Sequence, residues 1–238
     1  MSFRISRSIA LAVFPMLGAL LPMAAPAQAP DGKIAERARK AGEIIAELVR
    51  EPDHSPPQSL LRNATCVAVV PDVLQVGMGV GGKVGFGLAS CRTATGWSLP
   101  TFMALKGGTF GFQIGAQSAD VVLVFMNKDA ARQIGSSSFD LGGQASVAAG
   151  PVGRNLSAET DYKLNAEIYS YSRTKGLFAG ITLSGTKWEI DSKANRAVYQ
   201  KDAGAAELLT TNGSNAPALV QPFLASLRQN VGPQGGAE

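Results

Sequence analysis

The stretch KLNAEIYSYSRTKGLFAGITLSG, Lys163 to Gly185, predicts a β-hairpin. Its first half alternates with a period of two, which is typical of a half-buried strand rather than a helix. One side carries Leu164, Ala166, Ile168 and Ser170, and the other carries Asn165, Glu167, Tyr169 and Tyr171. Leu177 to Leu183 has the character of the second strand. The five residues Ser172 to Gly176 connect the two, with Gly176 free to adopt a positive φ, so the hairpin tip presents Arg173 and Lys175.

Four further phrases precede this hairpin in the chain. They are VVPDVLQVGMGVGGKVGFGLAS (Val69 to Ser90), GWSLPTF (Gly96 to Phe102), GTFGFQIGAQSADVVLVFMN (Gly108 to Asn127) and GPVGRN (Gly150 to Asn155). With SYSRTKGLFAG from the hairpin, they give the chain a resemblance to the SYLF-domain family. That family is known from lipid-binding proteins of the eukaryotic cell cortex and from secreted bacterial proteins. The resemblance implies a lipid-binding domain without catalytic residues, reported in eukaryotic members to bind phosphoinositides and actin.

The glycine-rich block from Gly77 to Gly87 imitates two nucleotide-binding motifs, G-x-x-x-x-G-K and G-x-G-x-x-G. Neither fits, because a phosphate loop needs a following helix and a Ser or Thr after its lysine. Here Val84 follows Lys83, and the chain continues with strand-like alternation. Glycines 77, 79, 81, 85 and 87 share one parity, so they line one face of an extended chain. Such a face lets the sheet bend or another backbone approach closely, and no nucleotide partner is predicted.

The remaining pattern predicts an α+β fold with a curved, mainly antiparallel sheet or partial barrel, flanked by amphipathic helices at both ends. Predicted strands are Cys66 to Val70, Val84 to Ser90, Trp97 to Leu105, Thr109 to Ser118, Val121 to Met126, one or two within Phe139 to Ala149, and an edge strand Lys187 to Ile190. Short helices are predicted at Asn127 to Gly135 and Ser192 to Tyr199. We expect a β-rich domain over 59–200, and a polar stretch, a helix from Ala216 to Gln229 and a tail over 201–238.

The first amphipathic helix is predicted from Lys33 to Arg50, followed by a proline-rich linker that completes the segment 30–58. Its apolar residues are Ile34, Ala38, Ala41, Ile45, Leu48 and Val49. Two interpretations remain open. The apolar stripe packs on the sheet, or the helix, through its cations Lys33, Arg37, Arg39 and Lys40, meets a membrane surface, in line with the lipid-binding use of this helix that the resemblance implies. Glu36, Glu43 and Glu47 interrupt the basic face.

Residues 1–29 have the pattern of a secretory signal peptide. Arg4 and Arg7 precede an apolar run, Ile9 to Leu21, and Ala27-Gln28-Ala29 matches the small-residue cleavage pattern. We therefore expect cleavage near Ala29 and a periplasmic or secreted protein. The cut removes two arginines and no acids, so 22 Lys and Arg against 18 Asp and Glu become 20 against 18. A nucleic-acid partner is not indicated, and any affinity for anions must come from local clusters.

The two cysteines of the chain, Cys66 and Cys91, both lie in the exported part. An oxidising compartment favours a disulfide between them over two reduced core thiols. The bridge would join two neighbouring predicted strands and add about 3 kcal/mol of stability in the chain-entropy model. No metal site or cofactor is predicted, since the single histidine, His54, stands among prolines.

The search for catalytic chemistry finds no nucleophile elbow, no well-placed general base and only scattered carboxylates, so no enzymatic activity is predicted. The leading hypothesis is a non-catalytic module that associates with anionic, phosphoinositide-like lipid head groups in the bacterial envelope. Candidate contacts are Lys33, Arg37, Arg39, Lys40, Arg173 and Lys175. The alternative is an actin-binding-like, protein-binding scaffold of the envelope, and an enzyme ranks third.

Overall fold

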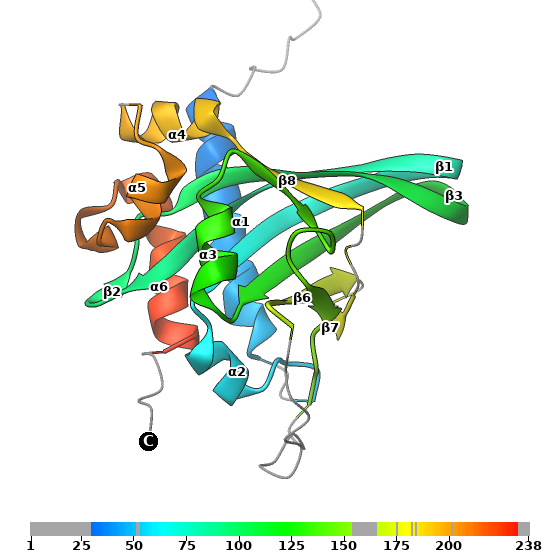
Figure 1. Cartoon of the computed structure of the whole chain (residues 1–238), viewed down its shortest axis with the longest axis horizontal. Helices are drawn as coiled ribbons and strands as arrows, with labels where there is room; N and C mark the ends of the chain where they lie inside the picture. The colour runs from blue at the N-terminus through cyan, green and yellow to red at the C-terminus, as the bar shows by residue number, and fades with distance from the viewer. Residues whose placement is uncertain are drawn as a thin grey trace, which may run out of the picture.

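The computed structural model describes residues 30–50, 53–153, 166–174, 176–181, 183, 185–200 and 202–232. Lys175, the predicted signal peptide 1–29 and the start of the predicted hairpin, residues 163–165, lie outside the described residues. Figure 1 shows the order of the elements. The helices are α1 Pro30–Leu48, α2 Gln58–Asn63, α3 Lys128–Ile134, α4 Ser192–Tyr199, α5 Ala205–Thr210 and α6 Gln221–Asn230. The strands are β1 Cys66–Thr93, β2 Gly96–Trp97, β3 Thr101–Phe125, β4 Ser138–Leu141, β5 Val147–Ala149, β6 Ile168–Thr174, β7 Leu177–Gly180 and β8 Thr186–Ile190.

Two long antiparallel strands, β1 and β3, form the centre of the sheet. They pair from Cys66 opposite Phe125 to Ala89 opposite Thr101. The last part of β3 pairs with β6, and its first part pairs with β8, which in turn pairs with β4. Strand β6 also pairs with β7 in the antiparallel sense and with β5 in the parallel sense. The α+β class with a curved, mainly antiparallel sheet is thus confirmed.

The sheet curls so far that the two ends of β1 meet. Cys66 and Cys91 form a disulfide, and the backbone N–H of Arg92 donates to the carbonyl oxygen of Thr65 at 2.8 Å. A Cβ atom at Gly87 would lie 2.2 Å from the carbonyl oxygen of Val69 on the opposite limb of the same strand. Glycine is required there because the two limbs cross in direct backbone contact. The sheet is therefore a half-barrel, and strand β1 curves round it until its two ends meet.

The predicted division of this region into short strands is wrong. Pro71-Asp72 does not end a strand, because Asp72 adopts a left-handed φ of 49° in an irregularity that shifts the register between Val70 and Val73. Likewise 106–108, predicted as a connection, pairs with 82–84 across the ladder. Pairing with a distant part of the chain keeps 106–108 extended, and pairing of the residues on either side of Pro71-Asp72 carries β1 through the irregularity.

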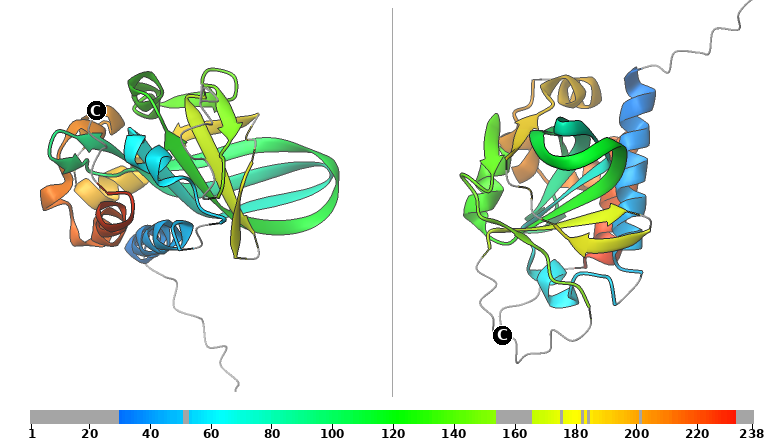
Figure 2. Two further views of the ribbon diagram at one scale, coloured as in Figure 1. Left: turned by 90° about the horizontal axis from the view of Figure 1, so that it is seen from below. Right: turned by 90° about the vertical axis from the view of Figure 1, so that its right-hand side faces the viewer.

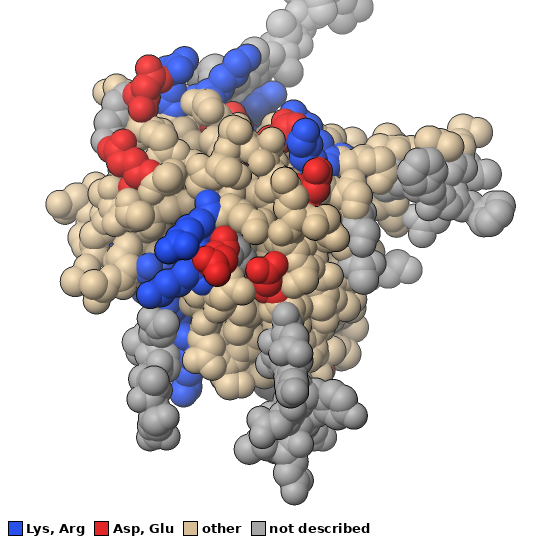
Figure 3. Space-filling view, viewed as in Figure 1, with Lys and Arg blue, Asp and Glu red and all other residues tan. Residues whose placement is uncertain are grey.

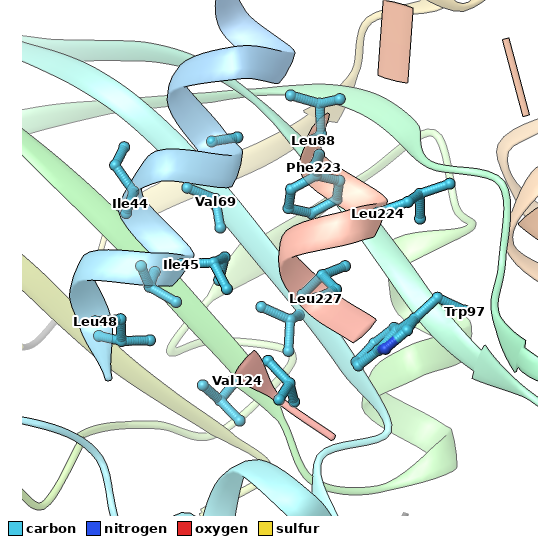
Figure 4. Close-up of a cluster of buried hydrophobic side chains, with 14 of the residues drawn as sticks. Ile44, Ile45, Leu48, Val69, Leu88, Trp97, Val124, Phe223, Leu224 and Leu227 are labelled. Carbon is cyan, nitrogen blue, oxygen red and sulfur yellow. The ribbon is translucent and has the colours of Figure 1, made fainter. Parts of the chain in front are cut away.

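The helix-side core lies between the sheet and the two terminal helices. Ile45 and Leu48 of α1, Val69 and Leu88 of β1, and Phe223 of α6 are all fully buried in it (Figure 4). Helices α1 and α6 contact each other closely, since Ser226 Oγ donates to the carbonyl oxygen of Gly42 at 2.6 Å. The apolar stripe predicted for the first helix is therefore packed inward, and the first of the two interpretations is confirmed.

A second core lies on the other face of the sheet, beside α3, β4 and β8. Trp188 of β8 is fully buried between Phe125 and Phe139, with ring centroids 6.0 Å and 5.6 Å away. Because β8 pairs with both β3 and β4, the prediction that it is an edge strand is wrong. Val121 to Phe125 is buried on both faces, and this central strand was predicted from its wholly apolar sequence.

The β6–β7 hairpin is confirmed with three corrections. Thr174 pairs with Leu177, so the connection has two residues rather than five, and Gly176 adopts a positive φ of 88°. Residues 168–171 are all buried, because one face of β6 meets the helix-side core and the other meets the second core. The strand is therefore not half-buried. The second strand ends at Gly180, three residues before the predicted end.

The predicted short helices at α3 and α4 are confirmed, and Phe139 to Ala149 contains two strands, β4 and β5. The predicted polar stretch before the last helix contains α5, whose Ala205, Leu208 and Leu209 are buried. Helix α6 begins at Gln221 rather than at Ala216, since two short 3₁₀ turns, Gly213–Asn215 and Ala218–Val220, precede it.

Candidate interaction surfaces

The predicted cations of α1 mostly hold partners within the chain. Arg37 Nη1 lies 3.2 Å from Asp191 Oδ2, and its guanidinium stands 5.1 Å above the centre of the Phe86 ring. Arg39 pairs with Glu36 at 2.6 Å and also with Glu43, on the same helix. Lys33 is exposed, and among the described residues it holds no ion pair. Lys33 is thus the α1 cation best placed to contact an external anion.

Lys40 and Arg173 belong to one charged network that ties α1 to the sheet. Lys40 Nζ lies 2.6 Å from Asp72 Oδ2, and the Asp72 N–H donates to Asp120 Oδ1 at 3.0 Å. Arg173 Nε and Nη2 donate to Asp120 Oδ2 at 2.9 Å and 2.6 Å, and Arg173 also pairs with Glu47 of α1. The network therefore connects α1, β1, β3 and β6. The sequence predicted a lipid contact for Arg173, whereas its guanidinium faces carboxylates here.

The electrostatics of this network follow from burial and pairing. Its half-buried position raises the pKa of the Asp120 carboxyl and lowers that of the Arg173 guanidinium, because desolvation disfavours both charged forms. The hydrogen bond to Asp72 raises the pKa of the Lys40 ammonium. Asp72, Asp120 and Arg173 border a polar cleft of about 250 Å³ that Ser118, Ala119, Thr174 and Gly176 complete. The guanidinium is occupied by these carboxylates, so the cleft is built around an internal ion pair.

Replacing Arg173 tests whether this network stabilises the fold. Arg173→Met leaves Asp120 and Glu47 without their shared cation, so we expect the free energy of unfolding to fall by about 2 kcal/mol. The matched control is Arg132→Met, which removes an exposed pair with Asp129 on α3 and should leave the stability unchanged within error. Urea unfolding followed by circular dichroism measures both, and an equal effect of the two changes would contradict a stabilising role for the network.

A projecting two-stranded ribbon is the most distinctive surface of the molecule. We call it the arm and define it as Leu74–Phe86 of β1 with the paired 104–118 of β3. Figures 1 and 2 show it extending beyond the helices and curving back to the body. Its outer row consists of exposed apolar side chains at alternate positions, namely Leu74, Val76, Met78, Val80, Val84 and Phe86. Outside the arm, the described residues include two other exposed large apolar side chains, Val152 and Leu177.

The opposite parity of β1 carries the glycines, and it is the inner face of the curl. A Cβ at Gly77 would lie 3.0 Å from Gly81 Cα, and a Cβ at Gly85 would lie 2.7 Å from Val70 Cγ1 and Val73 Cγ2. The predicted role of this face in bending and in close backbone approach is thus confirmed, and the block is continuous strand rather than a phosphate loop. Sequence reasoning used the glycines and missed the complementary apolar row. The apolar row could have been found from the same alternation of residues. Its exposure could not, because exposure depends on which other elements cover the strand.

Charge is almost absent from the arm. Between Val73 and Ala119 the sequence contains no Asp or Glu, and its cations are Lys83, Arg92 and Lys106. Arg92 lies in the body of the protein over Trp97, and Lys106 pairs with Glu189. Lys83 is half-buried, which lowers the pKa of its ammonium, and it holds no ion pair among the described residues. Figure 3 shows no charged side chain on the described part of the arm beyond its base in that view.

The described part of the chain offers no other obvious site. Within it, no group of three or more His, Cys, Asp or Glu side chains is placed to hold a metal ion. Among the described helices, none combines the length and the apolar character that a bilayer crossing requires. Lys175, predicted to act together with Arg173, lies outside the described residues, so this pairing stays a prediction.

Comparison with known proteins places residues 106–230 under the family Ysc84, described as "Las17-binding protein actin regulator". The chain is 35% identical over 203 residues to the "SH3 domain-containing protein PJ696.02" of Schizosaccharomyces pombe, covering 81% of this chain and 46% of the relative. It is 34% identical over 179 residues to the "SH3 domain-containing YSC84-like protein 1" of Xenopus laevis, covering 72% and 53%. It is 29% identical over 202 residues to "LAS seventeen-binding protein 3" of Saccharomyces cerevisiae, covering 81% and 44%. The chain spans about half the length of these curated relatives.

Proposed function

Because this chain belongs to the Ysc84 family, the SYLF-domain family that its sequence resembles, we propose that it is a non-catalytic binding module and that the surface it binds is an anionic lipid membrane. The observation that carries this proposal is the arm, which exposes a row of apolar side chains, interrupted at Gly82, on a segment that contains no acidic residue. Monomeric proteins rarely expose such rows unless a membrane or a partner covers them. An anionic surface favours a site whose few charges are positive.

The expected setting is the bacterial envelope, after export and cleavage near Ala29. In that compartment the module meets lipid head groups without crossing the bilayer. The Saccharomyces relative is named as a binding protein, which agrees with a function that requires no bond to be made or broken. Lys33, Arg37, Arg39, Lys40, Arg173 and Lys175 stay predicted contacts with lipid. The pairing of Arg37, Arg39, Lys40 and Arg173 within the chain favours Lys33 among them.

Flotation with liposomes tests the proposal. The protein without its leader should float with phosphatidylcholine vesicles that contain phosphatidylglycerol, more strongly as the anionic fraction rises and less strongly as salt is added. Lys33→Glu should weaken this binding by about 30-fold, since each charge near the surface contributes about 1 kcal/mol and the substitution reverses one charge. Lys128→Glu on α3 is the matched control, because it changes the net charge equally on another helix. Absence of binding at every anionic fraction would remove the proposal.

Binding to a protein partner is the second candidate function, and the family description and the name of one relative favour it. The family description mentions actin regulation and Las17 binding, and one relative is named for binding the latter. Co-sedimentation with actin filaments in the absence of lipid is the direct test for this chain. Binding that persists at high salt, together with indifference to liposomes, would make protein binding the better description.

A further inference from the structure

We propose that the arm enters the membrane interface tip first, with its outer row at the boundary between head groups and acyl chains and with Lys83 at the lipid phosphates. This inference rests on the proposed function and names the part of the molecule that performs it. The occupant of the outer row is thus a bilayer rather than a second copy or a protein partner. Four observations on the arm support it.

The first observation is the gradient of exposure along the outer row. Met78 and Val80, near the end of the arm, are 77% and 68% exposed, whereas Leu74 and Phe86, near its base, are both 44% exposed. The backbone register sets Met78 opposite Ile114 and Val80 opposite Phe110, so apolar residue types occupy both strands at the end of the arm. Burying apolar surface is favourable at about 25 cal/mol per Å². The end of the arm therefore gains most from leaving water.

The second observation is the distribution of charge. An inserted element must avoid carboxylates, because an acid near anionic head groups is repelled and its desolvation is costly. The arm meets this condition, since it lacks Asp and Glu on both strands. Charged residues instead gather at its base in three ion pairs, namely Arg173 with Asp120, Lys40 with Asp72 and Lys106 with Glu189. The boundary between paired charge and apolar row marks the depth to which the arm can enter.

The third observation concerns Lys83, which lies between the apolar end of the arm and this charged base. Its stem packs against the curl, with Cε within 2.9 Å of the position that a Cβ on Gly107 would take. Burial lowers the pKa of its ammonium, and no carboxylate among the described residues pairs with it. A lysine whose stem is covered by the protein and whose ammonium holds no ion pair among the described residues suits the interface, where the ammonium can reach a lipid phosphate.

The fourth observation limits the depth. The arm is two-stranded beyond Gly107, because Ala104 to Gly107 also pair with β8. A two-stranded ribbon satisfies the backbone hydrogen bonds on one edge of each strand only, and the outer edges need water or head groups as partners. Full insertion into hydrocarbon would leave those edges unsatisfied, which is strongly unfavourable. Shallow insertion, roughly 5–10 Å into the boundary region, avoids this cost while burying the outer row. We therefore expect contact with the upper acyl chain and not with the bilayer centre.

Site-specific labelling tests the inference. The two native cysteines are joined, so one introduced cysteine is the single free thiol. Val80→Cys, Leu74→Cys and Ala94→Cys each receive an environment-sensitive fluorophore, with Ala94 as the control, because it is exposed in the β1–β2 connection, away from the arm (Figure 1). With phosphatidylglycerol vesicles, the label at 80 should shift to the blue and be quenched by nitroxide placed high on the acyl chain. The label at 74 should respond less, and the label at 94 should not respond.

Substitutions give a second readout. Val80→Asp should weaken vesicle binding at least about tenfold, whereas Val152→Asp, at an exposed valine outside the arm, should leave it unchanged. Lys83→Gln should weaken binding to anionic vesicles about fivefold and have no effect on neutral ones. Circular dichroism of each variant verifies its folding.

The outcomes separate the two proposals. If the wild type floats with anionic vesicles while the label at 80 stays as exposed as the label at 94, the arm is not the inserted element and the proposed function survives. Equal binding by Val80→Asp and the wild type would overturn the inference in the same way. If the wild type binds no vesicle, both proposals fail. Protection of the label at 80 only when a protein partner is added would assign the outer row to that partner.

Discussion

Gly87→Ala should lower the free energy of unfolding by about 3 kcal/mol, because the added methyl group would stand 2.2 Å from the carbonyl oxygen of Val69 and 2.9 Å from Val70 Cα. Both of these are backbone atoms, so no side-chain rotation relieves the overlap. The two limbs of β1 would have to separate at the crossing that closes the half-barrel. Chemical unfolding of the variant, with the disulfide intact, measures the loss.

Gly82→Ala is the matched control for this change. It lies in the same glycine-rich segment and strand, but the nearest atom to its added Cβ would be 3.8 Å away, which is ordinary van der Waals contact. We expect stability within about 0.5 kcal/mol of the wild type, since a Gly to Ala change at an unstrained position slightly favours folding through the unfolded chain. If both variants lost stability equally, the cause would be a general demand for glycine in the strand rather than the crossing at Val69.

Trp188→Ala should be the most destabilising single truncation in the second core, with a loss of about 4 kcal/mol. The indole is fully buried, stacks with Phe139 at an interplanar angle of 27° and meets Phe125 edge-on at 82°. Its removal leaves a cavity between three strands, since β3, β4 and β8 each contribute one of these rings. Thermal or urea unfolding measures the loss.

Trp188→Phe separates packing from hydrogen bonding. The indole Nε1 has no hydrogen-bond partner among the described residues, so phenylalanine removes an unsatisfied buried donor while it keeps one aromatic ring. We expect a loss of about 1–2 kcal/mol, well below that of alanine. A loss as large as that of alanine would mean that the indole N–H, rather than ring packing, stabilises this core.

The parts of the fold that the sequence predicted are those set by neighbours along the chain. The apolar stripe of α1, the hairpin turn at Gly176 and the bending role of Gly77 to Gly87 all follow from local period and residue type. The continuity of β1 and β3 could not be predicted in this way. Pro71-Asp72 has turn chemistry, and β1 continues past it because Val70 and Val73 on either side pair with Val121 and Ala119, far along the chain.

The same limit applies to the candidate surfaces, since the sequence shows residue types along the chain but not contacts with distant elements. Arg173 was predicted in the connection at the hairpin tip, but it lies within β6. Its partners Asp120 and Glu47 come from other elements, and no local pattern reveals that a cation is already neutralised. In the sequence, the outer row of the arm has the alternation of an ordinary strand with one apolar face. That alternation does not show whether another part of the protein covers the face. Exposure of Met78 and Val80 results from the tertiary arrangement.

The bridge between Cys66 and Cys91 gives the arm an unusual mechanical property. Because the two half-cystines belong to one strand, the 25-residue separation between them becomes a closed covalent ring, and the β1 half of the arm is part of that ring. A pull on the tip therefore loads both limbs of β1, and the S–S bond holds these limbs together where they meet. A thiol reductant opens the ring and transfers the load to the ladder, so the force at which the body ruptures should depend on redox state.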